Sequence, residues 1–452
     1  MMEQSVKIES ARSTKTVVLL FLGMLVYKIT IDLSHWIVLM RYEPNVYISD
    51  FSLIKYILGF LWCVILFFGI RHTQYRVSTF LLYLMYLLQI IPITTVYGLS
   101  NENSLYYHVI CLGFLLCELI VGYTLDRPIF ERNTFVSQTM CICFAAAAAL
   151  VVGVCIAKNG VPSLTALNIY DVYELRSSGA FQLSKYLNYI LAWTMKVIFP
   201  IFIAKTLVEK KYGLSLFLCG LIFLIYLYSG HKAYLFSVPV VVLCTLWAKR
   251  KNFYKELFMA ASCGCGLLNL LTCAFPAQGG IIYRVYSLFV RRCILDSANT
   301  KFFYYDYFTK NPKMGLGGMF PRWLIQVNNP YADIDFQHEI GRIYFNAPEM
   351  NANTGFLAEG YMRFGHLGTI LVLVVLALLL KQMDRLQERT GYPLVVGMFA
   401  YPVFSLADAH LLDSFVIGPW MISLFILLFY KERQIVTKEY FLEHQIKSSK
   451  VT

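Results

Sequence analysis

Long apolar runs alternate with short polar connections along almost the whole chain. Each run is close to the roughly 20 residues that an α-helix needs to cross the hydrocarbon core of a bilayer. The first run is too long for a cleaved signal peptide and contains Lys28 and Asp32, so we interpret it as a membrane helix. The pattern predicts roughly twelve membrane-spanning helices, at residues 16–38, 52–70, 79–98, 105–123, 136–156, 187–205, 212–228, 233–248, 256–276, 364–380, 392–409 and 412–430.

Two connections between these runs are longer than the others, at residues 157–186 and 277–353. The second is too long to be a plain connector. Its segments YRVYSLFVRRCILDS and FFYYDYF are amphipathic, which predicts short helices that fold against the bundle. We therefore expect an all-α polytopic membrane bundle. Its predicted parts are residues 1–276 with nine spans, an external loop domain at 277–353, three further spans in 354–430 and a cytoplasmic tail at 431–452.

Composition supports a membrane protein. The chain is 58% hydrophobic and 15% charged, whereas soluble domains carry about 25% charged residues. Aromatic residues make up 16% of the chain, and many Tyr and Trp residues fall near the ends of apolar runs. Such a distribution is typical of the aromatic belts at membrane interfaces.

The net charge of +12 does not indicate a nucleic-acid partner, because the basic residues form short clusters between apolar runs. Cytoplasmic loops of membrane proteins carry an excess of Lys and Arg. Alternate connections here are basic, whereas opposite loops such as SNENS are poor in Lys and Arg. We therefore expect both termini in the cytoplasm. The basic connections are RHTQYR, DRPIFER, VEKK, AKRKNFYK and KQMDRLQER, together with the two tails.

The twelve cysteines predict neither a disulfide framework nor a metal site. Most of them lie inside apolar runs, and the SCGCG segment lacks a second pair at zinc-binding spacing. The chain also has no Walker A, HExxH or GxSxG pattern. We therefore expect no metal and no cofactor.

Basic residues in the predicted outer loops are not needed for topology, and arginine binds phosphate in a bidentate manner. Arg284, Arg291 and Arg292 have the spacing i, i+7, i+8, which places them on one face of an α-helix. If the loops converge, these cations suit a pyrophosphate; the alternative is contact with lipid headgroups or acidic loop residues. The candidate anion-binding residues are Arg176, Lys232, Arg284, Arg291, Arg292 and Arg322.

Two polar motifs precede the apolar run at 364–380. In QHEIGR, His338 and Arg342 share a helical face, and His338 or Glu339 could accept a proton; a structural or solvated histidine is the alternative. In NTGFLAEGYMRFGHLG, Glu359 and Arg363 are four residues apart. Such a pair is either functional, and then part of the substrate- or pyrophosphate-binding site, or a clamp between helices. Three further polar residues are weaker candidates for a pocket rim: Asp408, His410 and Asp413.

With these features, the chain resembles the oligosaccharide repeat-unit polymerases, the Wzy-type O-antigen polymerase family. The resemblance lies in the number of spans, the basic turn SGHK between two mid-chain spans, the large external loop, and the segment NTGFLAEGYMRFGHLG that leads into a span. The resemblance covers most of the chain, and it lies in the architecture more than in the individual residues. Each motif by itself has weak specificity for the family. The resemblance implies a GT-C-type fold in the bacterial inner membrane, with an active site on the outer face.

The resemblance also implies a reaction. A growing glycan on undecaprenyl pyrophosphate is transferred to a new lipid-linked repeat unit, without a metal, and a chain-length regulator and a flippase are implied partners. By position, Lys232 matches the basic residue of the short turn, and Arg176 matches one in the shorter outer loop. Arg and His residues of the long loop correspond to the pyrophosphate-binding and catalytic groups, namely His338, Glu339 and Arg342 for catalysis. The chain departs from the family in having Lys in that turn and no clean paired-Arg motif.

Three other functions remain open. A flippase for lipid-linked oligosaccharides also has about twelve spans, but it has internal pseudo-symmetry that this chain lacks. A polysaccharide O-acyltransferase would place its histidine in or near a span, unlike His338. An O-antigen ligase shares the polymerase architecture and differs only in its acceptor.

Overall fold

The computed structural model describes residues 2–47, 50–70, 76–123, 137–160, 183–250, 253–277, 280–319, 327–412, 420 and 423. Every regular element within these ranges is a helix, which confirms the all-α prediction. The chain divides into two compact units. Unit 1 comprises residues 1–124, 252–381 and 405–416, and unit 2 comprises residues 125–251, 382–404 and 417–452.

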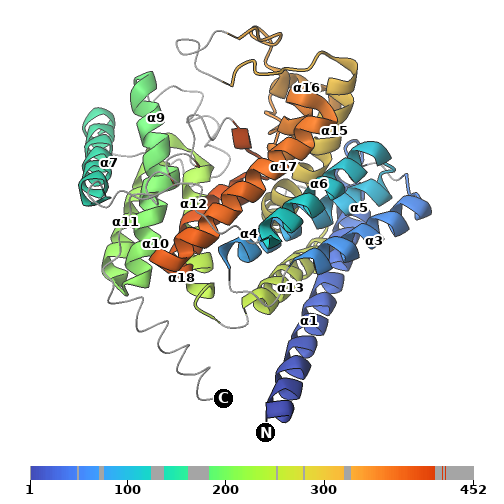
Figure 1. Ribbon diagram of the computed structural model, residues 1–452. Coiled ribbons are helices and arrows are strands. Elements are labelled where there is room, and N and C mark those ends of the chain that lie inside the picture. The colour runs from blue at the N-terminus through green and yellow to red at the C-terminus, as the bar shows by residue number, and fades with distance from the viewer. Residues whose placement is uncertain are drawn as a thin grey trace. The chain divides into compact units, whose positions relative to one another are not determined.

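Unit 1 is built around helices near the N-terminus. Helix α1 (Met2–Leu33) packs against α13 (Phe253–Ala274) and α5 (Ile91–Leu99), and α3 (Leu53–Gly69) packs against α5 and α6 (Ser104–Gly122) (Figure 1). Side chains cap several helices: Ser52 accepts a hydrogen bond from the N–H of Lys55, and Asn103 accepts one from Tyr106. The helices are α1 (Met2–Leu33), η1 (Ser34–Leu39), α2 (Met40–Tyr42), α3 (Leu53–Gly69), α4 (Val77–Met85), η2 (Tyr86–Ile90), α5 (Ile91–Leu99), α6 (Ser104–Gly122), α13 (Phe253–Ala274), α14 (Ile281–Tyr286), η5 (Ser287–Asp296), α15 (Ser297–Lys310), α16 (Phe336–Tyr344) and α17 (Phe356–Thr390).

The long connection begins with a continuous helical run, from α14 through the π-helix η5 to α15. The helical prediction for its amphipathic segments is therefore confirmed, although they join into one run. Lys301, in α15 of this helical run, is buried. Its ammonium donates hydrogen bonds to Ser297 Oγ and to the carbonyl of Ala407. Burial lowers the pKa of Lys301 to about 8, although the nearby Asp408 opposes this shift. The first part of the long connection is thus part of the core of unit 1.

Unit 2 contains a smaller group of helices. Helix α10 (Phe199–Val208) packs against α11 (Tyr212–Ser229) and α12 (Lys232–Trp247). The hydroxyls of Thr206 and Ser215 hydrogen bond at 2.6 Å between α10 and α11. Gly397 lies against Thr245 and Ala204, so a side chain there would clash. The helices are α7 (Ser137–Asn159), α9 (Lys185–Trp193), η4 (Thr194–Ile198), α10 (Phe199–Val208), α11 (Tyr212–Ser229), α12 (Lys232–Trp247) and α18 (Tyr392–Ser405).

Seven helical segments within the described residues are long and apolar enough to cross a membrane, as expected for an integral membrane protein. Shorter apolar helices coincide with four further predicted spans. The predicted span at 412–430 lies almost wholly outside the described residues, so the total of twelve stays a prediction. The seven segments are Val17–Tyr42, Val77–Leu99, Ser104–Gly122, Leu187–Val208, Tyr212–Ser229, Glu256–Ala274 and Phe356–Gln387.

Candidate functional site

Helix α17 is interrupted where the polar stretch meets the apolar run. Phe364 and Gly365 leave the helical conformation, and Gly365 has φ 66° and ψ −150°, a region open mainly to glycine. The two segments meet at Gly360 and Gly368, where a Cβ on Gly368 would lie 2.0 Å from the Gly360 carbonyl oxygen. Glycine at these positions therefore permits the break.

The segment that follows α15 stabilises this break. The N–H groups of Met314 and Gly315 donate to the carbonyls of Met362 and Arg363, at 3.0 and 3.1 Å. In an uninterrupted helix these carbonyls would accept from residues four positions later. Arg363 Nη1 also donates to the carbonyls of Gly315 and Gly317, both at 3.0 Å. A distant loop thus supplies the hydrogen bonds that the break removes.

Glu359 and Arg363 form a buried ion pair, with Arg363 Nε 3.2 Å from Glu359 Oε1. The side chains are 0% and 1% exposed, respectively. Glu359 Oε2 accepts from the backbone N–H groups of Leu411 and Leu412, at 2.6 and 3.0 Å. Because both carboxylate oxygens have protein partners, the structure favours the clamp interpretation for Glu359.

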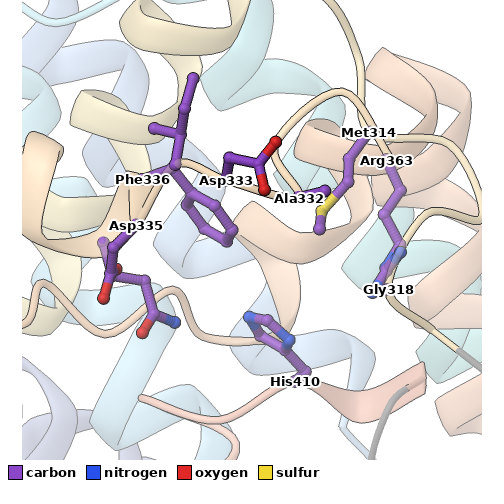
Figure 2. A pocket seen from close by; sticks show the side chains of 10 residues that line it. Met314, Gly318, Ala332, Asp333, Asp335, Phe336, Arg363 and His410 are labelled. Atoms are coloured by element: carbon purple, nitrogen blue, oxygen red, sulfur yellow. The ribbon is translucent and has the colours of Figure 1, made fainter. Parts of the chain in front are cut away.

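A cavity of about 520 Å³ opens beside this clamp, and all of its lining belongs to unit 1. Figure 2 shows the rings of Phe336 and His410 between Asp335 on one side and Arg363 on the other. His410, which the sequence indicated only as a weaker rim residue, therefore lines the cavity. The lining residues are Met314, Gly318, Ala332, Asp333, Ile334, Asp335, Phe336, Gln337, Arg363 and His410.

The charges of the lining favour a ligand rich in hydroxyl groups over an anion. Asp333 and Asp335 contribute two carboxylates, of which that of Asp335 also contacts His338. The guanidinium of Arg363 is already paired with Glu359. Ionised carboxylates accept hydrogen bonds from hydroxyls and repel phosphate. Within the described part of the chain, no group of three His, Cys, Asp or Glu side chains is placed to hold a metal ion.

His338 lies next to this lining, near the start of α16. Asp335 caps the helix by accepting from the N–H of His338, and Asp335 Oδ2 lies 2.8 Å from His338 Nδ1. Burial raises the pKa of Asp335, but the hydrogen bonds from His338 outweigh it and bring the pKa below its ordinary value. A proton on Nδ1, held by the carboxylate, leaves Nε2 as the acceptor. This geometry suits a general base.

Glu339 and Arg342 are engaged with each other on α16. Arg342 Nη2 and Nε donate to the two oxygens of Glu339, at 2.5 and 3.1 Å. The hydrogen bond from Arg342 lowers the pKa of Glu339, and Glu339 in turn raises that of Arg342. A carboxylate with a lowered pKa is a weaker base, so the geometry favours His338 over Glu339 for accepting a proton.

The three arginines of the predicted anion-binding face differ in their surroundings. Arg291 forms an ion pair with Glu43, and its Nε lies 3.7 Å from Asp296. Arg284 and Arg292 are exposed. The predicted common face assumed α-helical spacing, whereas Arg291 and Arg292 lie in the π-helix η5, which has a different periodicity.

The remaining sequence candidates do not belong to the described residues of unit 1. Lys232 begins α12 in unit 2, whereas the lining of the cavity belongs to unit 1. Arg176, Arg322 and Asp413 lie outside the described residues.

Sequence reasoning missed Asp333, Asp335 and Phe336, which line the cavity. A signal was present in the segment YADIDFQ, where two acidic residues stand directly before the predicted helix of His338. Aspartate is a common helix N-cap, so this position could have been connected to His338 from sequence alone.

Comparison with protein-family models, with curated proteins and with solved structures finds no significant match to this chain.

Proposed function

We propose that this chain is a membrane-bound glycosyltransferase that polymerises lipid-linked oligosaccharides. In this proposal, a growing glycan passes from undecaprenyl pyrophosphate to a hydroxyl of a new lipid-linked repeat unit on the outer face of the inner membrane. The observation that carries the proposal is the polar cavity with two carboxylates, whose lining includes Arg363, the residue that directly precedes the break in α17. This helix contains a segment that can span a membrane. A lipid-bound sugar could enter such a cavity while its lipid stays in the bilayer.

The side chains at the cavity suit the acceptor hydroxyl. Nε2 of His338 takes the proton as the hydroxyl oxygen attacks the anomeric carbon, and the bond from that carbon to the pyrophosphate oxygen breaks. Asp335 orients the imidazole and stabilises the imidazolium that forms. Asp333 and Gln337 supply polar groups for other sugar hydroxyls.

The basic residues have two different roles in this proposal. Arg363 keeps the cavity wall in place through the carbonyls of Gly315 and Gly317, and its charge is offset by Glu359. Arg284 and Arg292 remain candidates for the pyrophosphate, whose developing negative charge needs cations in the transition state. A ligase would use the same groups with a different acceptor, so the choice of acceptor separates the two activities.

The test uses purified protein in vesicles with lipid-linked repeat units as the only sugar substrate. A ladder of longer glycans is the expected product, and its absence in the presence of a confirmed substrate contradicts the polymerase proposal. Substitution His338→Gln should reduce the rate by about 10²–10⁴-fold, the usual contribution of a general base. The melting temperature should stay unchanged because His338 is partly exposed.

The matched control is Arg342→Gln on the same helix, which should retain most activity because the Arg342–Glu339 ion pair is exposed. Substitution Asp335→Asn should reduce the rate less than His338→Gln. Wild-type turnover by the His338→Gln protein would place the base elsewhere.

A further inference from the structure

A second group of side chains gathers at the break in α17, around Lys313. Its ammonium lies 3.8 Å from the centre of the Tyr361 ring and donates to the carbonyl of Phe308. If Gly365 carried a Cβ atom, that atom would lie 3.8 Å from Cε of Lys313. The lysine side chain therefore lies next to the break in α17. The hydroxyls of Tyr361 and Thr309 hydrogen bond at 2.8 Å, which fixes the ring under the ammonium.

His366 begins the apolar segment of α17 beside this lysine. Its ring centre lies 5.1 Å from that of Tyr361, 5.9 Å from Tyr305 and 6.5 Å from Tyr106. Among the described residues its Nδ1 atom is buried and has no hydrogen-bond partner. A buried polar atom without a protein partner keeps its capacity to hydrogen bond to a bound group.

The charges of this group differ from those of the cavity. Within the described residues, neither Lys313 nor His366 forms an ion pair, whereas the nearby Lys310 is 2.7 Å from Asp306. Partial burial also lowers the pKa of Lys313. An anion at this position would restore the electrostatic stabilisation that burial removes.

Exposed apolar side chains flank the same position. Leu316, Phe364 and Leu367 are 44%, 39% and 79% exposed. Leu316 belongs to the loop that hydrogen bonds to the break, and the other two flank Gly365 and His366. The group therefore combines a cation with an apolar border, next to a segment that can span a membrane. A lipid headgroup with its alkyl chains has the matching chemistry.

We infer that Lys313 and His366 bind the phosphate group of a membrane lipid whose chains lie against Leu316, Phe364 and Leu367. The lysine supplies a point charge, and the histidine supplies a ring nitrogen that can hydrogen bond to a phosphate oxygen. A bulk phospholipid and a polyprenyl carrier share this chemistry. The inference goes beyond the proposed function, because it holds whether or not the protein transfers glycans.

The test measures lipid binding to the purified full-length protein by native mass spectrometry, with a thermal-shift assay in parallel. The probes are undecaprenyl phosphate, phosphatidylglycerol and inorganic phosphate. Substitution Lys313→Gln should weaken binding of the lipid phosphates by about tenfold or more, whereas the control Lys310→Gln should not, since Lys310 already pairs with Asp306. Lys313→Arg should restore binding. His366→Phe keeps a ring among the tyrosines and should weaken binding without loss of melting temperature.

The pattern of binding identifies the source of the phosphate. Preference for undecaprenyl phosphate supports a carrier-lipid site, and equal binding of phosphatidylglycerol supports a general headgroup site. Equal losses for Lys313→Gln and Lys310→Gln would overturn the site. Inorganic phosphate binding as tightly as the two lipids would overturn the role of the apolar border.

Discussion

Each oxygen of the Glu359 carboxylate has a different protein partner. One accepts from the guanidinium of Arg363, and the other accepts from the backbone of Leu411 and Leu412. Burying these charges carries a desolvation cost, which the ionic hydrogen bonds offset only when every partner is in place. At the scale of single residues, Glu359 connects the break in α17 with the segment that carries His410.

Arg291 leads to a prediction at the same scale. Its partners Glu43 and Asp296 come from different parts of unit 1, and Asp296 is buried. Substitution Arg291→Met should therefore lower the free energy of unfolding by about 1–3 kcal/mol, because it leaves a buried carboxylate with weaker compensation. Thermal or denaturant unfolding in detergent measures this change.

The control for Arg291→Met is Lys310→Met, which removes an exposed ion pair worth about 0–1 kcal/mol. If Arg291 instead binds a pyrophosphate donor, donor affinity should fall while unfolding stays unchanged, contrary to our expectation.

At the scale of elements, the break in α17 is the feature that positions both the cavity and the lysine site. Each segment of the helix follows from its own sequence, but the angle between them depends on Met314 and Gly315, which are distant in the chain. The apolar pattern therefore predicts a helix from residue 364 onward, but not the shorter helical segment that precedes it at the break.

A prediction for the break concerns Gly368. Substitution Gly368→Ala places a methyl group 2.0 Å from the Gly360 carbonyl oxygen, so the backbone must shift. Overpacking of this kind typically costs about 1–3 kcal/mol, and here backbone is the neighbour that must move. The melting temperature and the rate of limited proteolysis should both show the loss.

Gly264→Ala in α13 is the matched control for this substitution. Nothing lies within 4 Å of the added methyl group, so stability should rise slightly because alanine favours the helix. A Gly368→Ala protein as stable as wild type would show that the two segments of α17 do not meet closely.

The helices could be predicted from sequence because apolar runs of sufficient length have few alternatives in a bilayer. The site could be predicted only in part. His338 and Arg363 stood out by residue type and spacing, and both lie at or beside the cavity. Arg291 carries the positive charge expected of a residue that binds phosphate. Only the fold reveals that Glu43 and Asp296 pair with it. Lys313 was indistinguishable from other loop lysines until the break placed it over Tyr361.

At the scale of the whole molecule, the proposed function requires the cavity to face away from the cytoplasm. A reporter fused after Lys310 should be active on the outer side of the membrane, and one fused after Arg385 should be active in the cytoplasm. The basis is the alternation of basic and neutral connections along the chain. Alkaline phosphatase and a fluorescent protein, which are active on opposite sides, provide the measurement.

A cytoplasmic signal at Lys310 would place the following loop, and the cavity it lines, on the wrong side for a lipid-linked donor. The fusion after Lys158, at the end of α7, is a useful reference because the predicted topology places it outside as well.

The close contact between Gly360 and Gly368 has a consequence for recognising distant relatives. Residues 359–368 read Glu-Gly-Tyr-Met-Arg-Phe-Gly-His-Leu-Gly, and five of these positions have a structural requirement. The pattern Glu-Gly-x-x-Arg-x-Gly-x-x-Gly therefore describes a piece of backbone geometry. Apolar spans diverge freely as long as they stay apolar, whereas this geometry tolerates almost no exchange. Homologues whose overall similarity has faded should still carry this short signature at the start of a late membrane helix.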